Sequence, residues 1–248
     1  MNSYMTQGHS ASDVALVETI VSQRLKGSIL WMVVGLLTTM GMGIATLMNP
    51  QWAKFALSNF NILLLVEVGV VFLFSMRTYS ANVMTLRGMF FLYSALNGVT
   101  LSIVSAAYGI MDATVPALIG ALAFFIAFSI VGLTTKRNLS GLAPYLGAAV
   151  LGMIIVSLAF MAGNYFDIGW IKAINYSSFS LFMGYAGVIV FSIFTAVDMN
   201  MIKNTVTQLA LTEDESILDR VEIAGALSLY LDFINLFLSL LRIFGNKK

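Results

Sequence analysis

The chain has 248 residues, of which 59% are hydrophobic and 10% are charged, and its mean hydropathy is +0.90. Because soluble domains carry about 25% charged residues, this composition indicates an integral membrane protein and excludes a soluble domain. A net charge of +1, no cysteine and a single histidine, His9, in a polar tail exclude nucleic-acid binding, thiol chemistry and a histidine-dependent site within the membrane.

The N-terminal tail, residues 1–27, is polar and shows no signal-peptide pattern. Within it, the stretch SDVALVETIVSQRLKG has the spacing of a short amphipathic helix lying at the membrane surface. A flexible tail with one helical turn fits the same residues equally well, so both interpretations stay open.

Seven apolar segments follow, each close to the roughly 20 residues that a membrane-spanning helix needs. They cover residues 28–48, 60–76, 88–108, 115–133, 142–161, 177–199 and 225–244. Most connections are short and contain Gly, Pro or Asn, whereas residues 200–223 form one long acidic connection that is expected to be partly helical. We therefore predict one seven-helix transmembrane domain over residues 28–245, followed by a basic tail at 246–248.

Lysine and arginine set the expected orientation, because cytoplasmic loops carry an excess of them. The side of the N-terminus holds Arg24, Lys26, Arg77, Arg87, Lys136, Arg137, Lys203 and Arg220, and the opposite side holds Lys54 and Lys172. The N-terminus is therefore expected in the cytoplasm. The basic tail FGNKK disagrees if the seventh segment spans and agrees if that segment is re-entrant. We favour a spanning segment, because no Pro or internal Gly interrupts it.

The seventh segment carries a polar stripe. Spacings of three and four residues place these positions on one helical face: Gly225, Ser228, Asp232, Asn235, Ser239 and Arg242. A charge at the bilayer centre costs roughly 2.5–3.5 kcal/mol, so such a face turns toward other helices or water. We predict an all-α fold with the C-terminal helix central and surrounded by the other six. On this pattern alone, Asp232 is either functional or a buried packing residue hydrogen-bonded to its neighbours.

Asp198 ends a second inward face, on the sixth segment. The other members of that face are small, polar or aromatic: Ser180, Gly184, Gly187, Phe191 and Thr195. Asp198 lies about 7 Å along its helix from Lys203, and Asp232 about 10 Å from Gly225, so one depth is expected for both. Two such carboxyl groups would share a proton and would offer hard oxygen ligands to Ca²⁺, as a pH-sensing ion gate. The alternative for Asp198 is an interfacial carboxylate in water.

Two further charges lie in or beside the second segment. Glu67, midway through LLLVEVGVVFLF, is with Asn235 a candidate pore-lining or proton-binding residue. Arg77 ends the segment on the cytoplasmic side, where it would either latch ionised carboxylates or simply anchor the helix. In the third segment, polar side chains either hydrate a pathway or form hydrogen bonds between helices: Asn97, Thr100, Ser102 and Ser105.

Four stretches resemble one known family. GALSLYLDFINLFLSLLRIFG, at the C-terminus, is similar to the signature of the Bax inhibitor-1 family, also called the transmembrane Bax inhibitor motif proteins. LNGVTLSIVSAAYG, SIVGLTTKRNLSGLAPYLGAAVLG and FTAVDMNMI resemble the motifs of its third helix, its fourth-to-fifth helix region and its sixth helix. The resemblance extends from about Glu67 to Gly245 and is most specific in the last motif.

The resemblance implies a seven-helix fold with a central last helix and a pH-sensitive calcium leak gated by a di-aspartyl pair. By motif, that pair maps to Asp198 and Asp232, and a latch by an arginine of the second helix maps to Arg77. Some bacterial members are instead tied to the control of a membrane-bound protease. The chain departs from the family at Asn138, where an aspartate is usual, and in its long acidic connection over residues 200–223.

Two other function classes fit part of the pattern. Intramembrane aspartyl proteases also place one aspartate on each of two helices, but LYLD stands here instead of Gly-x-Gly-Asp, and Pro-Ala-Leu occurs only upstream, at residues 116–118. We therefore predict that the protein is not an enzyme. The alternative to a channel is a non-conducting regulator that binds another membrane protein, such as a membrane-bound protease.

The expected partners are the lipid bilayer, protons and calcium ions, with no permanently bound cofactor, and the oligomeric state is left open. The absence of a targeting signal together with a cytoplasmic N-terminus favours a bacterial inner membrane.

Overall fold

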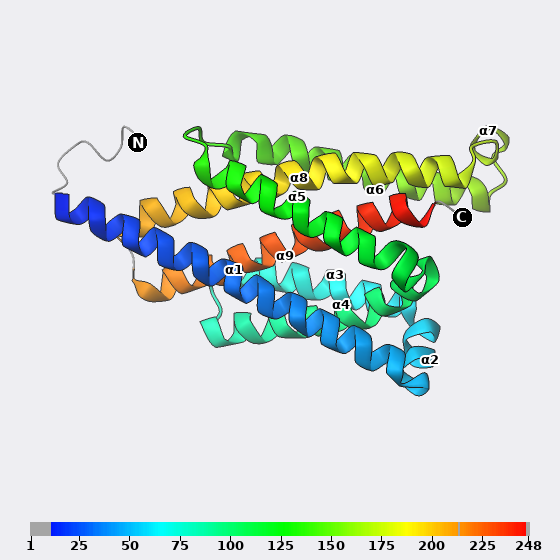
Figure 1. The fold of residues 1–248 in the computed structure, drawn as a ribbon, viewed down its shortest axis with the longest axis horizontal. Helices are drawn as coiled ribbons and strands as arrows, with labels where there is room; N and C mark the ends of the chain where they lie inside the picture. Colours follow the sequence, from blue (N-terminus) through cyan, green and yellow to red (C-terminus); the bar gives the residue numbers. More distant parts are fainter. Residues whose placement is uncertain (1–10, 213, 247–248) are drawn as a thin grey trace. The chain divides into compact units, whose positions relative to one another are not determined.

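The computed structural model describes residues 11–212 and 214–246, with the side chains of Trp170 and Lys172 left out. His9, Lys247 and Lys248 lie outside the described residues. Throughout the described part, regular structure is helical (Figure 1): α1 (Ala11–Met48), α2 (Pro50–Ser58), α3 (Phe60–Arg77), α4 (Val83–Tyr108), α5 (Val115–Thr134), α6 (Ala143–Tyr165), α7 (Gly169–Lys172), α8 (Tyr176–Leu209) and α9 (Glu215–Gly245). A π-helical turn at Ile110–Thr114 precedes α5, and a 3₁₀ turn at Ser140–Leu142 precedes α6.

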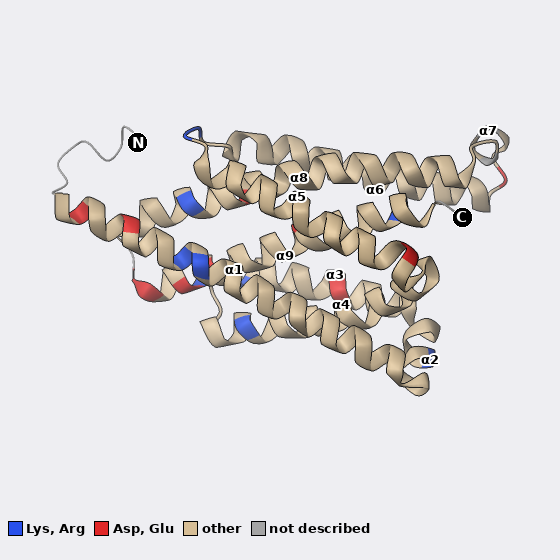
Figure 2. Cartoon of the chain, viewed as in Figure 1, with Lys and Arg blue, Asp and Glu red and all other residues tan. Residues whose placement is uncertain are grey.

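Seven helical stretches of the described chain are long and apolar enough to cross a membrane, which confirms the predicted fold class. Figure 2 shows long uncharged stretches along these helices, as burial in hydrocarbon requires. Within an 18-residue apolar stretch of α9, 72% of the residues are buried, whereas in the corresponding stretch of the span that contains α6 only 6% are buried. The C-terminal helix is therefore the most enclosed of the seven, whereas few residues of α6 are fully buried.

The described chain divides into two compact units. Unit 1 comprises residues up to Ala107 together with Met201–Leu231, and unit 2 comprises Tyr108–Asn200 together with the chain from Asp232 onward. Helices α8 and α9 each contribute to both units, so each provides a continuous backbone from one unit into the other.

The first helix begins 17 residues earlier than the predicted span at residue 28, because α1 starts at Ala11. The amphipathic stretch at residues 12–27 is thus the first part of α1 and not a separate surface helix. Proline is absent from the stretch, and Gly27 faces α9 closely enough that a Cβ there would overlap the carboxyl group of Glu222. Gly27 is thus a contact point between α1 and α9.

The predicted long connection over residues 200–223 is also mostly helical. Helix α8 continues to Leu209 and α9 begins at Glu215, so the connection shrinks to residues 210–214. In addition, the predicted loop after the first span contains α2, which Asn49 caps by accepting hydrogen bonds from Gln51 N (2.9 Å) and Trp52 N (3.3 Å). Pro50 takes the first position of α2, where the missing N–H has no helical partner anyway.

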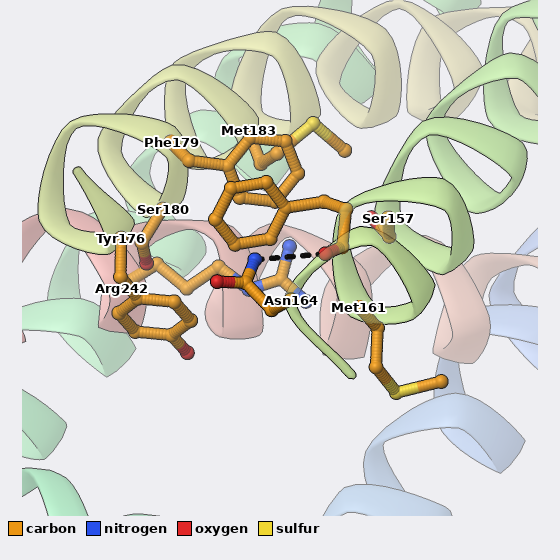
Figure 3. Close-up of a pocket in the computed structure, with 9 residues that line it drawn as sticks. Ser157, Met161, Asn164, Tyr176, Phe179, Ser180, Met183 and Arg242 are labelled. Carbon is orange, nitrogen blue, oxygen red and sulfur yellow. Dashed lines mark hydrogen bonds between the residues drawn. The ribbon is translucent and has the colours of Figure 1, made fainter. Parts of the chain in front are cut away.

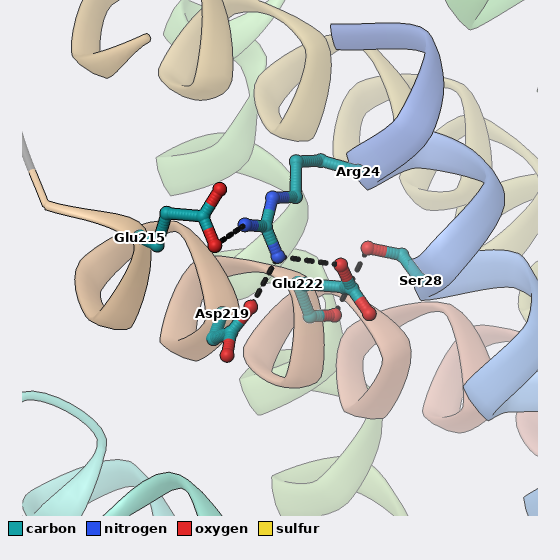
Figure 4. Close-up of polar contacts among 5 residues, drawn as sticks. All are labelled: Arg24, Ser28, Glu215, Asp219 and Glu222. Atoms are coloured by element: carbon teal, nitrogen blue, oxygen red, sulfur yellow. Dashed lines mark hydrogen bonds and ion pairs between the residues drawn. The ribbon is translucent and has the colours of Figure 1, made fainter. Parts of the chain in front are cut away.

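The acidic start of α9 lies against α1 through one arginine (Figure 4). The Arg24 guanidinium bonds Asp219, donates to Glu222 Oε2 at 3.2 Å and lies 4.0 Å from Glu215 Oε2. Ser28 Oγ adds a 2.9 Å hydrogen bond to the Glu222 carbonyl. These contacts explain why α9 extends beyond the apolar segment: its first two turns are fixed by α1.

The core of unit 1 combines aromatic packing with one buried hydroxyl pair. Tyr230 of α9 is fully buried and packs edge-on against Phe90 and Tyr93 of α4, at centroid distances of 5.7 Å in both cases. Its hydroxyl lies 2.6 Å from Thr39 Oγ1 of α1, which also bonds the Ser94 carbonyl at 2.9 Å. Every polar atom of this contact is therefore paired, which a water-free interior requires.

Replacing Gly98 with Ala is expected to lower the free energy of unfolding by about 1–3 kcal/mol, because overpacking forces backbone shifts. A Cβ at Gly98 would overlap the backbone carbonyl of Thr39, so α1 and α4 would have to separate. Gly88, on the same helix, has nothing within 4 Å of such a Cβ. Thermal unfolding of the detergent-solubilised variants measures the difference, and equal midpoints for Gly98→Ala and Gly88→Ala would contradict the close packing.

Small residues bring α8 and α9 together in unit 2, as the sixth-segment pattern predicts. A Cβ at Gly184 would lie 3.0 Å from the Ser239 carbonyl, and one at Gly187 would overlap the Ser239 hydroxyl. Ser239 belongs to the polar stripe of α9, so in this unit the stripe faces α8. Gly132 of α5 makes a similar approach to the carbonyl of Ala196 on α8.

Candidate ion-gating site

Asp232 is buried in the half of α9 that belongs to unit 2. The residue is 5% exposed, and its Oδ2 has no hydrogen-bond partner among the described residues. The next residue, Phe233, packs edge-on against Phe125 of α5 with a centroid distance of 5.8 Å. An oxygen that is buried without a donor is unfavourable, so this carboxyl group is not explained as a fully satisfied packing residue.

Asp198 lies in the same unit, on α8, and is half-buried. Its charge acts directly on Asp232, so the structure brings the two predicted carboxyl groups into electrostatic range. The close approach of α8 and α9 at Gly184 and Gly187 provides the physical cause, because it aligns the face that ends in Asp198 with the stripe that contains Asp232.

Asn200, two residues beyond Asp198, positions this end of α8 and was missed as a candidate residue. Its Oδ1 accepts a hydrogen bond from Leu139 N at 2.9 Å, and its Nδ2 donates to the carbonyls of Gly132 and Arg137, both at 3.2 Å. The residue is 1% exposed. The available signal was an amide close to Asp198 on the same helix, but its partners lie more than 60 residues away in the chain.

The loop that Asn200 holds contains Asn138, where the chain departs from the family pattern. Asn138 Oδ1 accepts from Ser140 N at 3.0 Å, which is a local turn contact that an amide makes as well as a carboxylate.

The other three predicted site residues lie in different surroundings. Arg77 ends α3 in unit 1 with an exposed side chain, so its role as a latch stays a prediction. Asn235 is half-buried one turn after Asp232, and its carbonyl accepts from Ser239 Oγ at 2.6 Å. Glu67 is 7% exposed and belongs to unit 1.

Glu67 has partners on the next helix. Thr100 Oγ1 donates to its Oε1 at 2.7 Å, and Asn97 Nδ2 donates to its Oε2 at 3.4 Å. Of the two interpretations offered for the polar third segment, these two residues fit interhelical hydrogen bonding. The arrangement joins α3 to α4 inside unit 1.

Replacing Glu67 with Ala is expected to lower the free energy of unfolding by about 1–3 kcal/mol, because Asn97 and Thr100 lose their hydrogen bonds to a buried carboxyl group and Thr100 keeps only its bonds within α4. Glu67→Gln keeps an acceptor for Thr100 and should recover most of that loss. Thermal unfolding in detergent checks the pair of variants. A Glu67→Ala protein as stable as the unaltered chain would mean that the hydrogen bonds carry no net stabilisation.

The described residues contain no group of three or more His, Cys, Asp or Glu side chains placed to hold a metal ion. Calcium takes six to eight oxygen ligands, so the two aspartates alone could supply only part of a coordination shell.

Comparison with known proteins gives the family. A family model described as "Inhibitor of apoptosis-promoting Bax1" matches residues 21–248. The inner membrane protein YbhL of Escherichia coli (strain K12) is 38% identical over 223 residues, covering 88% of this chain and 89% of that protein. A membrane protein of Streptococcus pyogenes serotype M1 is 40% identical over 157 residues, covering 63% of this chain and 62% of the relative. With both the motifs and these similarities in agreement, the chain belongs to the Bax inhibitor-1 family.

Proposed function

We propose that this membrane protein is a pH-sensitive calcium leak channel gated by Asp198 and Asp232. The observation that carries the proposal is the buried Asp232 oxygen without a donor, beside a second carboxyl group. A transport function needs no enzymatic step, and the pair would act as a gate rather than as an acid–base catalyst.

The gate would work through the number of protons on the pair. Two neighbouring carboxylates in a low-dielectric interior repel each other, so a single shared proton stabilises their approach. When both are ionised, repulsion between them favours separation of α8 and α9 or neutralisation by a cation. Protons and calcium therefore compete for the same two groups, and flux is expected to change with pH.

From the family resemblance, we also propose that Arg77, at the end of α3, acts as a latch for the ionised pair. YbhL is named as an inner membrane protein, and we propose the same location for this protein, with its N-terminus in the cytoplasm. The alternative function is a non-conducting regulator that docks on another membrane protein, such as a membrane-bound protease.

Calcium influx into proteoliposomes that contain the purified protein, measured from about pH 5 to pH 8, tests the proposal. A flux that exceeds that of empty vesicles and changes across this range supports a pH-sensitive leak. No flux above empty vesicles at any pH would reject the channel and favour the docking regulator.

The Arg77→Ala protein should leak more calcium than the unaltered channel at the pH where the unaltered channel is least active. Unchanged flux would make Arg77 a membrane anchor.

A further inference from the structure

Unit 2 contains a cavity of about 380 Å³ between the end of α6, the beginning of α8 and the end of α9 (Figure 3). It lies on the α8–α9 face at a different level from Asp232, since Arg242 in its wall is ten residues further along α9. At 1.5 Å per residue, that separation is about 15 Å. The cavity is therefore distinct from the candidate gate.

The polar wall of the cavity is dominated by one cation. Figure 3 shows the Arg242 guanidinium in the middle of the lining side chains, beside Asn164. Arg242 is half-buried, and among the described residues no carboxylate lies within ion-pair distance of it. A partly buried charge without a counter-charge is unfavourable, and guanidinium binds phosphate through two parallel hydrogen bonds.

Two of the neighbouring polar side chains are already engaged in local contacts. Asn164 Nδ2 donates to the Phe160 carbonyl at 2.8 Å, and Ser180 forms a side-chain hydrogen bond with Tyr108. Neither neighbour carries a negative charge. Arg242 is thus left as the group that an incoming anion would contact first.

The remaining wall is apolar. Phe160 of α6 and Phe179 of α8 stack with their centroids 4.0 Å apart and an interplanar angle of 9°. Met161 and Met183 also line the cavity, and methionine side chains adapt to flexible hydrocarbon. A ligand that fits both walls must be an amphiphile with an anionic head.

The depth of the cavity matches a lipid head group. Arg242 lies three residues before the end of α9 at Gly245, which is about 5 Å along the axis. Tyr176 begins α8 and Tyr165 ends α6, and both are strongly exposed, at 69% and 82%. Exposed tyrosines at helix ends are typical of the membrane–water interface, where lipid phosphates lie.

We propose that this cavity binds an anionic phospholipid, with its phosphodiester on Arg242 and one acyl chain along Phe160, Met161 and Met183. The charge complementarity selects an anionic lipid over a zwitterionic one, and the apolar wall selects a lipid over a free anion. The site is independent of whether the protein conducts calcium.

Native mass spectrometry of the detergent-purified protein tests the proposal, with phosphatidylglycerol and phosphatidylcholine of identical acyl chains as probes. The unaltered protein should retain phosphatidylglycerol preferentially. Arg242→Gln should weaken that retention by about fivefold, the effect of one surface cation on an anionic lipid, and should leave phosphatidylcholine unaffected. Lys54→Gln, which removes one charge from the exposed surface of α2, is the control and should leave the retention of both lipids unchanged.

A second variant keeps the charge and fills the space. Ser157→Phe adds bulk to the cavity wall and should also reduce retention of phosphatidylglycerol. Equal retention of the two lipids by the unaltered protein would overturn the proposal, as would an undiminished preference in both Arg242→Gln and Ser157→Phe. Displacement of the lipid by millimolar inorganic phosphate would identify a free-anion site and would also overturn it.

Discussion

Asp232→Asn is expected to abolish the pH dependence of calcium flux, and Asp198→Asn is expected to do the same. Each substitution removes one titrating group from two carboxyl groups that lie within electrostatic range of each other. An amide neither binds nor releases a proton in this range, and it does not repel the remaining carboxylate. The calcium flux of each variant should therefore no longer change with pH, even if the flux itself becomes larger or smaller.

The double variant distinguishes a pair from two separate residues. If the two carboxyl groups act as one unit, Asp198→Asn combined with Asp232→Asn should add little to either single change, because coupled residues are not additive. Asp214→Asn, at an exposed position in the α8–α9 connection, is the matched control and should leave the pH profile unchanged. Additive effects of the two substitutions would show that the aspartates do not interact functionally.

Much of the site could be predicted because helical periodicity is a local property. The three-and-four spacing of the stripe on α9 and the small residues Gly184 and Gly187 on α8 depend only on sequence order, and the structure places both faces in contact. Those two patterns place Asp198 and Asp232 on facing helices of one unit, within electrostatic range of each other.

The contacts that sequence reasoning missed are between groups far apart in the chain. Nothing near Asn200 indicates that it binds the loop at residues 137–139. Interhelical hydrogen bonding by Thr100 was one of the two interpretations offered, but nothing in the sequence identifies Glu67 as its partner. The helix boundaries of α1 and α9 were missed for a related reason. Their polar ends do not look like membrane segments, and in the structure these ends lie against each other through the ion pairs of Arg24 with Asp219 and Glu222.

Arg24→Gln is expected to lower the free energy of unfolding by about 2–3 kcal/mol. The Arg24 side chain is 14% exposed, and it neutralises Glu222 and Asp219, which are 12% and 32% exposed. Its removal leaves the largely buried Glu222 and the partly exposed Asp219 one turn apart on α9 without the guanidinium that bonds both. Breaking such an ion pair costs more than the pair contributes. The loss should therefore exceed that expected for a surface ion pair.

Glu215 provides the matched comparison, because it touches the same guanidinium at 4.0 Å but is 94% exposed. Glu215→Gln should change stability very little, as solvent already screens that interaction. Asp219→Asn introduced into Arg24→Gln should restore part of the loss, since it removes one of the two uncompensated charges. Unfolding midpoints in detergent, compared across these four proteins, measure the effect. Similar midpoints for Arg24→Gln and Glu215→Gln would mean that α1 holds the start of α9 by apolar packing, without help from the ion pairs.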